Sequence, residues 1–408
     1  MIGHLCRLIW NRKRANALIL TELVAAFLVL AALGTGVAYY RHNARQPLGY
    51  SIDDVWVAGV GHGITRREGV PPEVMKEAMA TTKQLLQTVR DLPEVVSAAA
   101  AITGPIAQGM HNTQKSDDDS IPVLGRGLEY DIEYATDDFV RVFGLTVLRG
   151  HWFSRQDDGA GYLPAVINEK LARDFFADAD PLGQQIGVGD GDRPVRVVGV
   201  IAGYRQKGEL APPIRCLFRR YIPGDPQELP YHMLFVKTRP GTGAEFQATF
   251  DKRLRATASP EWSFSERRLT EARNSIRRVE LIPLKAAAIV AGFLMLMVIL
   301  GLTGVLWQNV TQRTREIGLR RAKGATRSHI YGQILGELMI MTCIAVGLGL
   351  VLVAHVPLLG LVDGISAVVY LQGSAAAALL IACVTGMCGF YPARLAARVQ
   401  PAFALRDE

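Results

Sequence analysis

The sequence lacks the motifs that would mark a self-contained enzyme. Its 408 residues contain no GxxxxGK[ST] phosphate-binding loop, no HExxH zinc-binding motif and no GxSxG nucleophile elbow. Cysteine is scarce: of five residues, only Cys216 lies in the polar middle of the chain, and no CxxC pair occurs. These absences predict a protein with no catalytic site, no cofactor or metal of its own, and no disulfide within its middle region.

Three polar features of the middle region are compatible with a binding function, but each has a simpler structural interpretation. Residues 187–191 (GVGDG) are followed by Pro194 and a β-branched run instead of a helix, so they predict a hairpin turn and not a dinucleotide site. The acidic run 117–119 could ligate calcium, although a solvated loop is the simpler interpretation. His111 and His151 have no evident partner in the sequence.

Apolar residues are concentrated in four runs, each long enough to cross a bilayer as a helix, which needs about 20 residues. The runs cover residues 17–40, 284–307, 334–356 and 368–391. The first run follows basic residues, as in a signal peptide, but it is too long and has no clean cleavage site, so it predicts an uncleaved anchor. We therefore predict an α-helical membrane protein with four transmembrane helices and a large α+β extracytoplasmic domain inserted between helices 1 and 2.

The net charge is +7, but many basic residues flank the apolar runs, which indicates membrane topology and not nucleic-acid binding. Segments 1–16, 308–333 and 392–408 are rich in Lys and Arg and lie on one side by parity, whereas the connection 355–367 has neither. A basic cluster at 267–285 falls on the other side, which long translocated domains tolerate. We predict a multi-pass protein of the plasma (inner) membrane, with both termini cytoplasmic and residues 41–280 outside.

Helix and strand patterns alternate within residues 41–280. Strands are predicted where β-branched and other apolar residues gather, at 54–60, 95–102, 195–201 and 231–238. Pro71-Pro72 opens an amphipathic helix over 73–92, Asn168 can cap a second helix, and a third is expected around 244–256. The mixture predicts an α+β domain in two subdomains, the smaller of which is inserted at about 107–221.

The connection between the second and third runs carries the most specific motif of the chain. Residues 314–326 read TREIGLRRAKGAT, which closely resembles the cytoplasmic motif (REIGxRRAxGA) of FtsX-like permeases of the MacB type. Residues 391–398 (YPARLAAR) resemble the closing segment of that family. Residues 139–153 and 165–183 resemble its periplasmic core domain, although His151 and Trp152 replace the usual arginine-led step. The resemblance covers nearly the whole chain.

The resemblance implies a permease subunit of an ABC transporter that couples ATP hydrolysis to movement outside the cytoplasm. It implies a dimer with a second permease copy or a paralogue, and possible periplasmic adaptor and outer-membrane channel partners. Full MacB proteins carry a fused N-terminal ATPase, whereas this chain starts at the first apolar run, so we expect ATP and Mg to be bound by a separate ATPase subunit. Export of a peptide, drug or lipid-linked substrate is the expected activity. The alternatives are transport-free mechanotransmission to a partner such as a cell-wall hydrolase, and lipoprotein release.

Two sets of residues are the candidate functional positions. Basic and glycine residues of the cytoplasmic motif are expected to contact the ATPase, although they could instead anchor helix ends at anionic lipid headgroups. These coupling residues are Arg315, Glu316, Ile317, Gly318, Arg320, Arg321, Gly324 and Ala325. The intramembrane carboxylates Glu22 and Glu337 are expected either to form a buried pair or a subunit contact, or to reach water near the inner headgroups.

Overall fold

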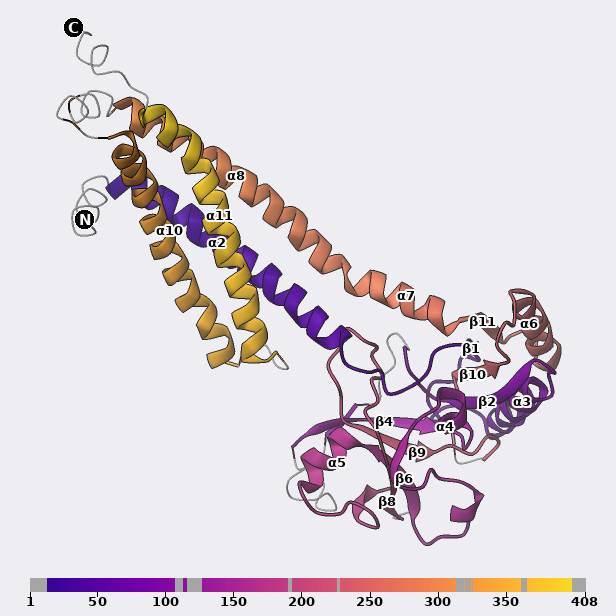
Figure 1. Ribbon diagram of the computed structural model, residues 1–408. Coiled ribbons are helices and arrows are strands. Elements are labelled where there is room, and N and C mark those ends of the chain that lie inside the picture. Colours follow the sequence, from indigo (N-terminus) through magenta and orange to yellow (C-terminus); the bar gives the residue numbers. More distant parts are fainter. Residues whose placement is uncertain are drawn as a thin grey trace. The chain divides into compact units, whose positions relative to one another are not determined.

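The computed structural model describes residues 13–106, 113–115, 127–189, 193–225, 228–312, 319, 324, 326–360 and 365–397 (Figure 1). The chain divides into two compact units. One unit consists of residues 43–279, close to the expected domain 41–280, and the other consists of the residues before and after it.

The unit formed by the residues before 43 and after 279 contains four helices that are long and apolar enough to cross a membrane. They are α2 (Lys13–Ala44), α8 (Ile282–Gln312), α10 (Arg327–Leu358) and α11 (Ala367–Ala397). Each has 31 or 32 residues and therefore extends about 47 Å, which is longer than the hydrocarbon core of a bilayer. The helices continue past both ends of most of the apolar runs, because polar residues at the run ends keep helical geometry outside hydrocarbon.

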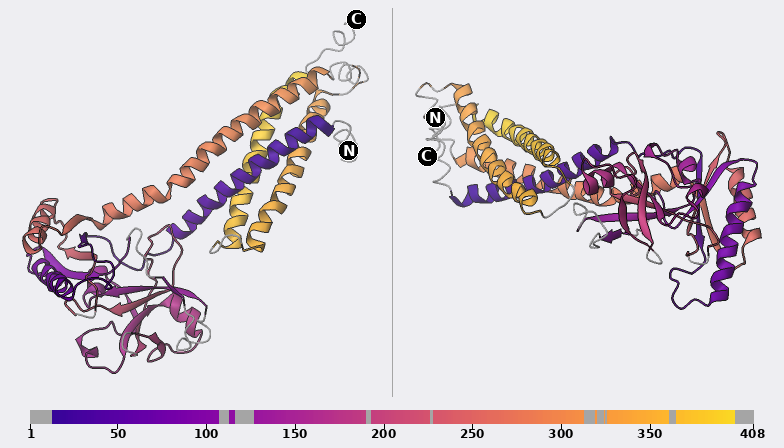
Figure 2. Two further views of the ribbon diagram at one scale, coloured as in Figure 1. Left: turned by 180° about the vertical axis from the view of Figure 1, so that it is seen from behind. Right: turned by 90° about the horizontal axis from the view of Figure 1, so that it is seen from below.

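Helix α2 contacts each of the other three helices (Figures 1 and 2). Its buried residues recur at helical spacing, and glycines let neighbouring helices approach closely. A Cβ placed on Gly373 of α11 would lie 2.3 Å from the backbone nitrogen of Thr35. A Cβ on Gly349 of α10 would lie 2.2 Å from the ring of Phe27. The Ala- and Gly-rich composition of α11 thus serves close packing against α2.

The unit of residues 43–279, which we call the outer unit, is built on one sheet of eleven strands. The strand order is β11-β1-β10-β2-β4-β9-β6-β8-β5, with β3 paired to β4 and β7 paired to β8. The strands are β1 (Val55–Gly61), β2 (Val95–Ala101), β3 (Thr113–Lys115), β4 (Glu129–Ala135), β5 (Val147–Gly150), β6 (Leu163–Asn168), β7 (Gln185–Val188), β8 (Pro194–Ile201), β9 (Cys216–Arg220), β10 (Met233–Thr238) and β11 (Ser263–Arg268). Its helices are α3 (Pro72–Arg90), α4 (Phe139–Phe143), α5 (Glu169–Phe176), α6 (Glu245–Thr257) and α7 (Leu269–Glu280), with a 3-10 turn, η2, at Arg155–Asp157.

The sheet is continuous, and different segments of the chain supply its two ends. Strands β3 to β9 all come from the interval 107–221 and occupy one end, while the flanking segments supply β11, β1, β10 and β2 at the other. The two ends meet where β2 pairs with β4 through a single residue pair, Ala101 and Ala135. Beyond that junction, β4 pairs with β9 and β6 with β8 in parallel.

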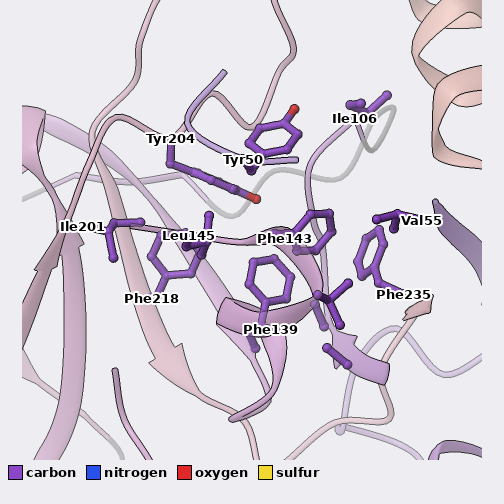
Figure 3. Packing of buried hydrophobic residues seen from close by; sticks show 14 of the residues in the cluster. Tyr50, Val55, Ile106, Phe139, Phe143, Leu145, Ile201, Tyr204, Phe218 and Phe235 are labelled. Carbon is purple, nitrogen blue, oxygen red and sulfur yellow. The ribbon is translucent and has the colours of Figure 1, made fainter. Parts of the chain in front are cut away.

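Both faces of the sheet are covered, as period-2 alternation requires. On β10, Leu234 and Val236 face the core beneath α3 and α6, and Phe235 between them faces the core beneath α4. In that second core the rings of Phe139, Phe143 and Phe235 pack together, with 5.0 Å between the centroids of Phe143 and Phe235 (Figure 3).

Several local expectations are confirmed. The predicted strands and helices correspond to β1, β2, β8, β10, α3, α5 and α6 within a few residues at each end. The side chain of Asn168 caps α5 by accepting a hydrogen bond of 3.0 Å from the nitrogen of Leu171. Strands β7 and β8 form the predicted hairpin, in which Gly189 N donates to Arg193 O at 2.9 Å.

One expectation was wrong. Nε2 of His151 lies 3.1 Å from Oδ1 of Asp157, so this histidine does have a partner. Asp157 closes the capping box of η2 with Ser154, and the turn itself brings the carboxylate back to the histidine six residues earlier. No sequence pattern indicates this contact, because η2 is a short 3-10 turn without periodicity. His111 and residues 117–119 lie outside the described residues.

Candidate functional site

The predicted coupling residues are mostly beyond the part of the chain that the structure describes. Arg315, Glu316, Ile317, Gly318, Arg320, Arg321 and Ala325 all lie outside it. Gly324 is described and has a φ of +97°, a conformation that a residue with a Cβ adopts only with strain. Two residues later, Thr326 caps α10 by accepting a hydrogen bond of 3.2 Å from the nitrogen of His329. Gly324 therefore allows the chain to turn into α10.

The two intramembrane carboxylates have different neighbours. Glu22, on α2, is half-buried, and its Oε2 lies 2.7 Å from the position that a Cβ on Gly301 of α8 would occupy. Glu337, on α10, is also half-buried, and its Oε1 accepts a hydrogen bond of 3.2 Å from Nε2 of Gln333. Gly301 thus leaves room on α8 for the carboxylate of α2.

The outer unit contains a buried arginine that the sequence did not single out. Arg205 lies in the connection between β8 and β9 and is only 2% exposed. Its Nη1 donates to the carbonyl oxygens of Asn43, at 2.6 Å, and Gln46, at 3.2 Å. Its Nη2 donates to the carbonyl oxygen of Glu209, at 2.9 Å, and to that of Ala211. One planar guanidinium therefore fastens the segment that leaves α2 to the β8–β9 connection.

The same connection is fastened to α7 by ion pairs. The carboxylate of Glu209, whose side chain is 10% exposed, is paired with Arg273 and, at 2.9 Å, with Arg277. Both arginines lie on the helix that precedes α8 in the chain. We call the set of Arg205, Glu209, Arg273 and Arg277, with the backbone of residues 43–46, the joint. It brings together the residues that enter and leave the outer unit.

A second buried polar cluster lies next to the joint. Glu133 on β4 is fully buried, and its carboxyl is hydrogen-bonded by Thr103 Oγ1 at 2.6 Å and by Gln206 Nε2 at 2.8 Å. Burial raises the pKa of Glu133 to about 8, because the charged form loses its hydration. Glu133 is therefore mainly neutral at pH 7, and it attaches β4 to the residue beside Arg205.

These buried polar residues carry little sequence signal. Arg205 sits in the stretch GYRQKG, whose glycines and charges are typical of an exposed loop. Two of the carbonyls that it binds, those of Asn43 and Gln46, are more than 150 residues away in the chain. Among the described residues, no group of three or more His, Cys, Asp or Glu side chains could hold a metal ion.

Four apolar helices, with a large α+β domain inserted between the first and the second, define a multi-pass membrane protein. Comparison with protein families identifies two parts of it. Residues 16–252 match the MacB-like periplasmic core domain, and residues 288–401 match the FtsX-like permease C-terminal domain. The chain belongs to the MacB-like and FtsX-like family of ABC transporter permeases, as its cytoplasmic motif predicted.

Curated relatives are similar along two thirds or more of the chain. The macrolide export ATP-binding/permease protein MacB of Bdellovibrio bacteriovorus is 26% identical over 100% of this chain and 62% of its own length. The pyoverdine export ATP-binding/permease protein PvdT of Pseudomonas entomophila is 25% identical over 98% of this chain and 59% of its own length. The chain thus spans about three fifths of these two proteins. The ABC transporter permease YknZ of Bacillus subtilis is 25% identical over 67% of this chain and 68% of its own length.

Two of the solved structures with similarity to this chain are periplasmic or extracellular domains of transporters. The periplasmic region of MacB from Actinobacillus actinomycetemcomitans aligns with 56% of this chain and 94% of its own, at 15% identity and a TM-score of 0.37. The extracellular domain of the transporter YknZ from Gram-positive bacteria aligns with 45% of this chain and 88% of its own, at 15% identity and a TM-score of 0.31.

Proposed function

We propose that this protein is the permease subunit of an export complex, in which ATP hydrolysis by a separate ATPase subunit drives a conformational change outside the membrane. The family match over both domains is the observation that carries the proposal. In this proposal ATP and Mg bind to the ATPase and not to these 408 residues, which contain no phosphate-binding loop. The working unit is a dimer of this chain with a second copy or a paralogue, with both termini in the cytoplasm.

The relatives indicate the class of substrate only in general terms. The names of two relatives specify the export of macrolides and of pyoverdine, which are different small molecules. Export of a peptide, drug or lipid-linked compound is consistent with that range, with a periplasmic adaptor and an outer-membrane channel as further partners.

The joint gives the proposed movement a physical route. Residues 43–46 comprise the last two residues of α2 and the two residues after it, and α7 directly precedes α8, so a shift of either helix pulls on backbone that the joint holds. Arg205 and Glu209 pass that pull to the β8–β9 connection, and Gln206 passes it to β4 through Glu133. ATP binding then does conformational work because the ATPase binds nucleotide differently in the two states of the permease.

The coupling step is tested by reversing the charge of the cytoplasmic motif. We expect the double variant Arg320→Glu, Arg321→Glu to insert normally but to lose recruitment or stimulation of the co-expressed ATPase. The matched control reverses two exposed basic residues of α6, Lys252→Glu with Arg253→Glu, and should keep ATPase activity at the wild-type level. Wild-type stimulation by the motif variant would reject the assignment of these arginines.

The orientation is tested separately by labelling. In a background without other cysteines, Asp118→Cys should react with a membrane-impermeant maleimide in cells with a permeabilised outer membrane. Leu319→Cys, on the predicted cytoplasmic side, should react only after the inner membrane is opened. Protection of position 118 would overturn the proposed topology without affecting the family assignment.

A further inference from the structure

Exposed arginines gather at the joint, at the two chain ends of the outer unit. Arg45 follows α2 directly, and Arg277 and Arg278 lie in the last turn of α7. All three are exposed. The proposed topology places them outside the cytoplasm, where the positive-inside rule gives no reason for an excess of arginine. Neither the fold nor the proposed function therefore accounts for this charge.

The chain keeps these arginines close to the surface of the bilayer. Arg45 is five residues after Tyr40, where the first apolar run ends, and Arg278 is six residues before Leu284, where the second begins. At about 1.5 Å per residue of helix, the intervening backbone is about 8 to 9 Å long. The headgroup region on each side of a bilayer is about 5 to 7 Å thick, and long arginine side chains can extend toward it. The guanidinium groups are thus within reach of lipid headgroups.

The joint does not neutralise its own arginines. Glu209 is shared by Arg273 and Arg277, so two guanidinium groups face one carboxylate. Nε of Arg277 lies 2.9 Å from Oε1 of Glu209, yet the side chain of Arg277 is still 45% exposed. The side chains of Arg45 and Arg278 have no hydrogen bond or ion pair among the described residues. These three arginines can therefore accept a further anionic partner from solvent or membrane.

Two more carboxylates lie on α7 and do not cancel this charge. Glu271 is in its first turn, two turns further from α8 than Arg278. Glu280 is half-buried, and its backbone carbonyl oxygen accepts a hydrogen bond of 3.3 Å from the hydroxyl of Tyr40. The joint and α7 together contain five arginines, Arg45 included, against three carboxylates. Positive charge remains in excess next to the bilayer.

We propose that Arg45, Arg277 and Arg278 bind the phosphate headgroups of anionic phospholipids in the adjacent leaflet. Guanidinium groups bind phosphate through paired, charge-assisted hydrogen bonds. Val279, which is 53% exposed next to Arg278, adds an apolar side chain, and basic and apolar residues together are typical of helices that rest on a membrane surface. This interaction requires only that α2 and α8 cross the bilayer, so it goes beyond the proposed function and needs no ATPase.

The test measures which lipids gather beside Arg278. In a background without other cysteines, Val279→Cys is labelled with a bimane fluorophore, and the full-length chain is placed in phosphatidylcholine nanodiscs. Spin-labelled phosphatidylglycerol or spin-labelled phosphatidylcholine is then added as a quencher. Because each arginine near an anionic surface contributes a factor of about five, phosphatidylglycerol should quench at a mole fraction at least tenfold lower. Equal quenching by the two lipids would overturn the proposal.

Variants assign the preference to the arginines. Arg45→Gln with Arg278→Gln should lower it at least tenfold, and Arg278→Gln alone about fivefold, which keeps the test valid if the double variant folds poorly. The matched control, Arg239→Gln with Arg253→Gln, removes the same charge from exposed positions far from both apolar runs in the chain and should leave the preference unchanged. An equal loss in the control would show a general effect of net charge and refute the site.

A last arm separates lipid from free phosphate. Sodium phosphate at 20 mM and constant ionic strength should leave the preference for phosphatidylglycerol in place, because the headgroup is held at the surface by its acyl chains. If inorganic phosphate abolishes the preference, the arginines bind the free ion and the assignment to lipid is wrong.

Discussion

Replacing Glu133 with glutamine tests whether the buried carboxyl beside the joint is neutral in the folded protein. The folded protein keeps a proton on Glu133 that the unfolded chain releases near pH 4.5, because burial raises the pKa to about 8. This group's contribution to stability is therefore fully present below pH 4.5, is lost as the pH rises from about 4.5 to about 8, and stays constant above that.

The expected effect is large enough to measure. Each pH unit in this window costs about 1.4 kcal/mol, so the wild type should lose about 3 kcal/mol between pH 5.5 and pH 8 from this group. For a unit of this size that corresponds to a fall in Tm of about 6 °C or more. In Glu133→Gln the side chain is permanently neutral and can still hydrogen-bond to Thr103 and Gln206, so this part of the pH dependence should vanish.

The assay follows tryptophan fluorescence of the full-length chain in detergent during heating at pH 5.5 and pH 8. The outer unit contains Trp56, Trp152 and Trp262, so the signal reports on its unfolding. Glu261→Gln, at an exposed position, is the control and should retain the pH dependence of the wild type. If Glu133→Gln also retains it, the carboxyl is already ionised in the folded protein and the reasoning from burial fails.

Two further predictions concern the joint and the helix packing. Arg205→Gln leaves buried carbonyls unpaired and should destabilise the outer unit by about 3 to 5 kcal/mol in thermal unfolding, with ATP hydrolysis retained but export uncoupled from it. Gly373→Leu places a side chain 2.3 Å from the backbone of Thr35 and should lower the stability of the helix bundle by about 1 to 3 kcal/mol. Gly386→Leu, on the same helix with no atom of another residue close to the new Cβ, should leave the Tm unchanged; equal losses in the two glycine variants would refute the packing argument.

Elements with local signals could be predicted from the sequence. The four candidate membrane helices follow from long, predominantly apolar runs, whose length matches the thickness of a bilayer. Helices α3 and α5 follow from Pro72 at the first helical position and from the Asn168 cap, which act within one turn of the chain. The cytoplasmic motif identified the family because its residues are consecutive.

Strand β4 shows why the rest could not be predicted. Its sequence, EYDIEYA, alternates as if Asp131 and Glu133 faced water, whereas both are buried. The partners of Glu133 are Thr103 and Gln206, 30 and 73 residues away, so no local pattern reveals its burial. The parallel pairing of β4 with β9 is equally non-local. The candidate joint depends on the same kind of distant contact, and sequence reasoning therefore missed it.

The joint is held together by buried polar residues, and this affects the kind of movement that it allows. Burying Arg205, Glu209 and Glu133 costs desolvation that well-packed apolar side chains would avoid, so stability alone does not account for them. Apolar cores resist continuous deformation, because small shifts open voids or create overlaps. Hydrogen bonds from one guanidinium to several carbonyls can instead be exchanged one at a time, while the others hold. The proposed function requires two discrete arrangements of the joint with the sheet beside it intact, and exchangeable hydrogen bonds of this kind are compatible with that requirement.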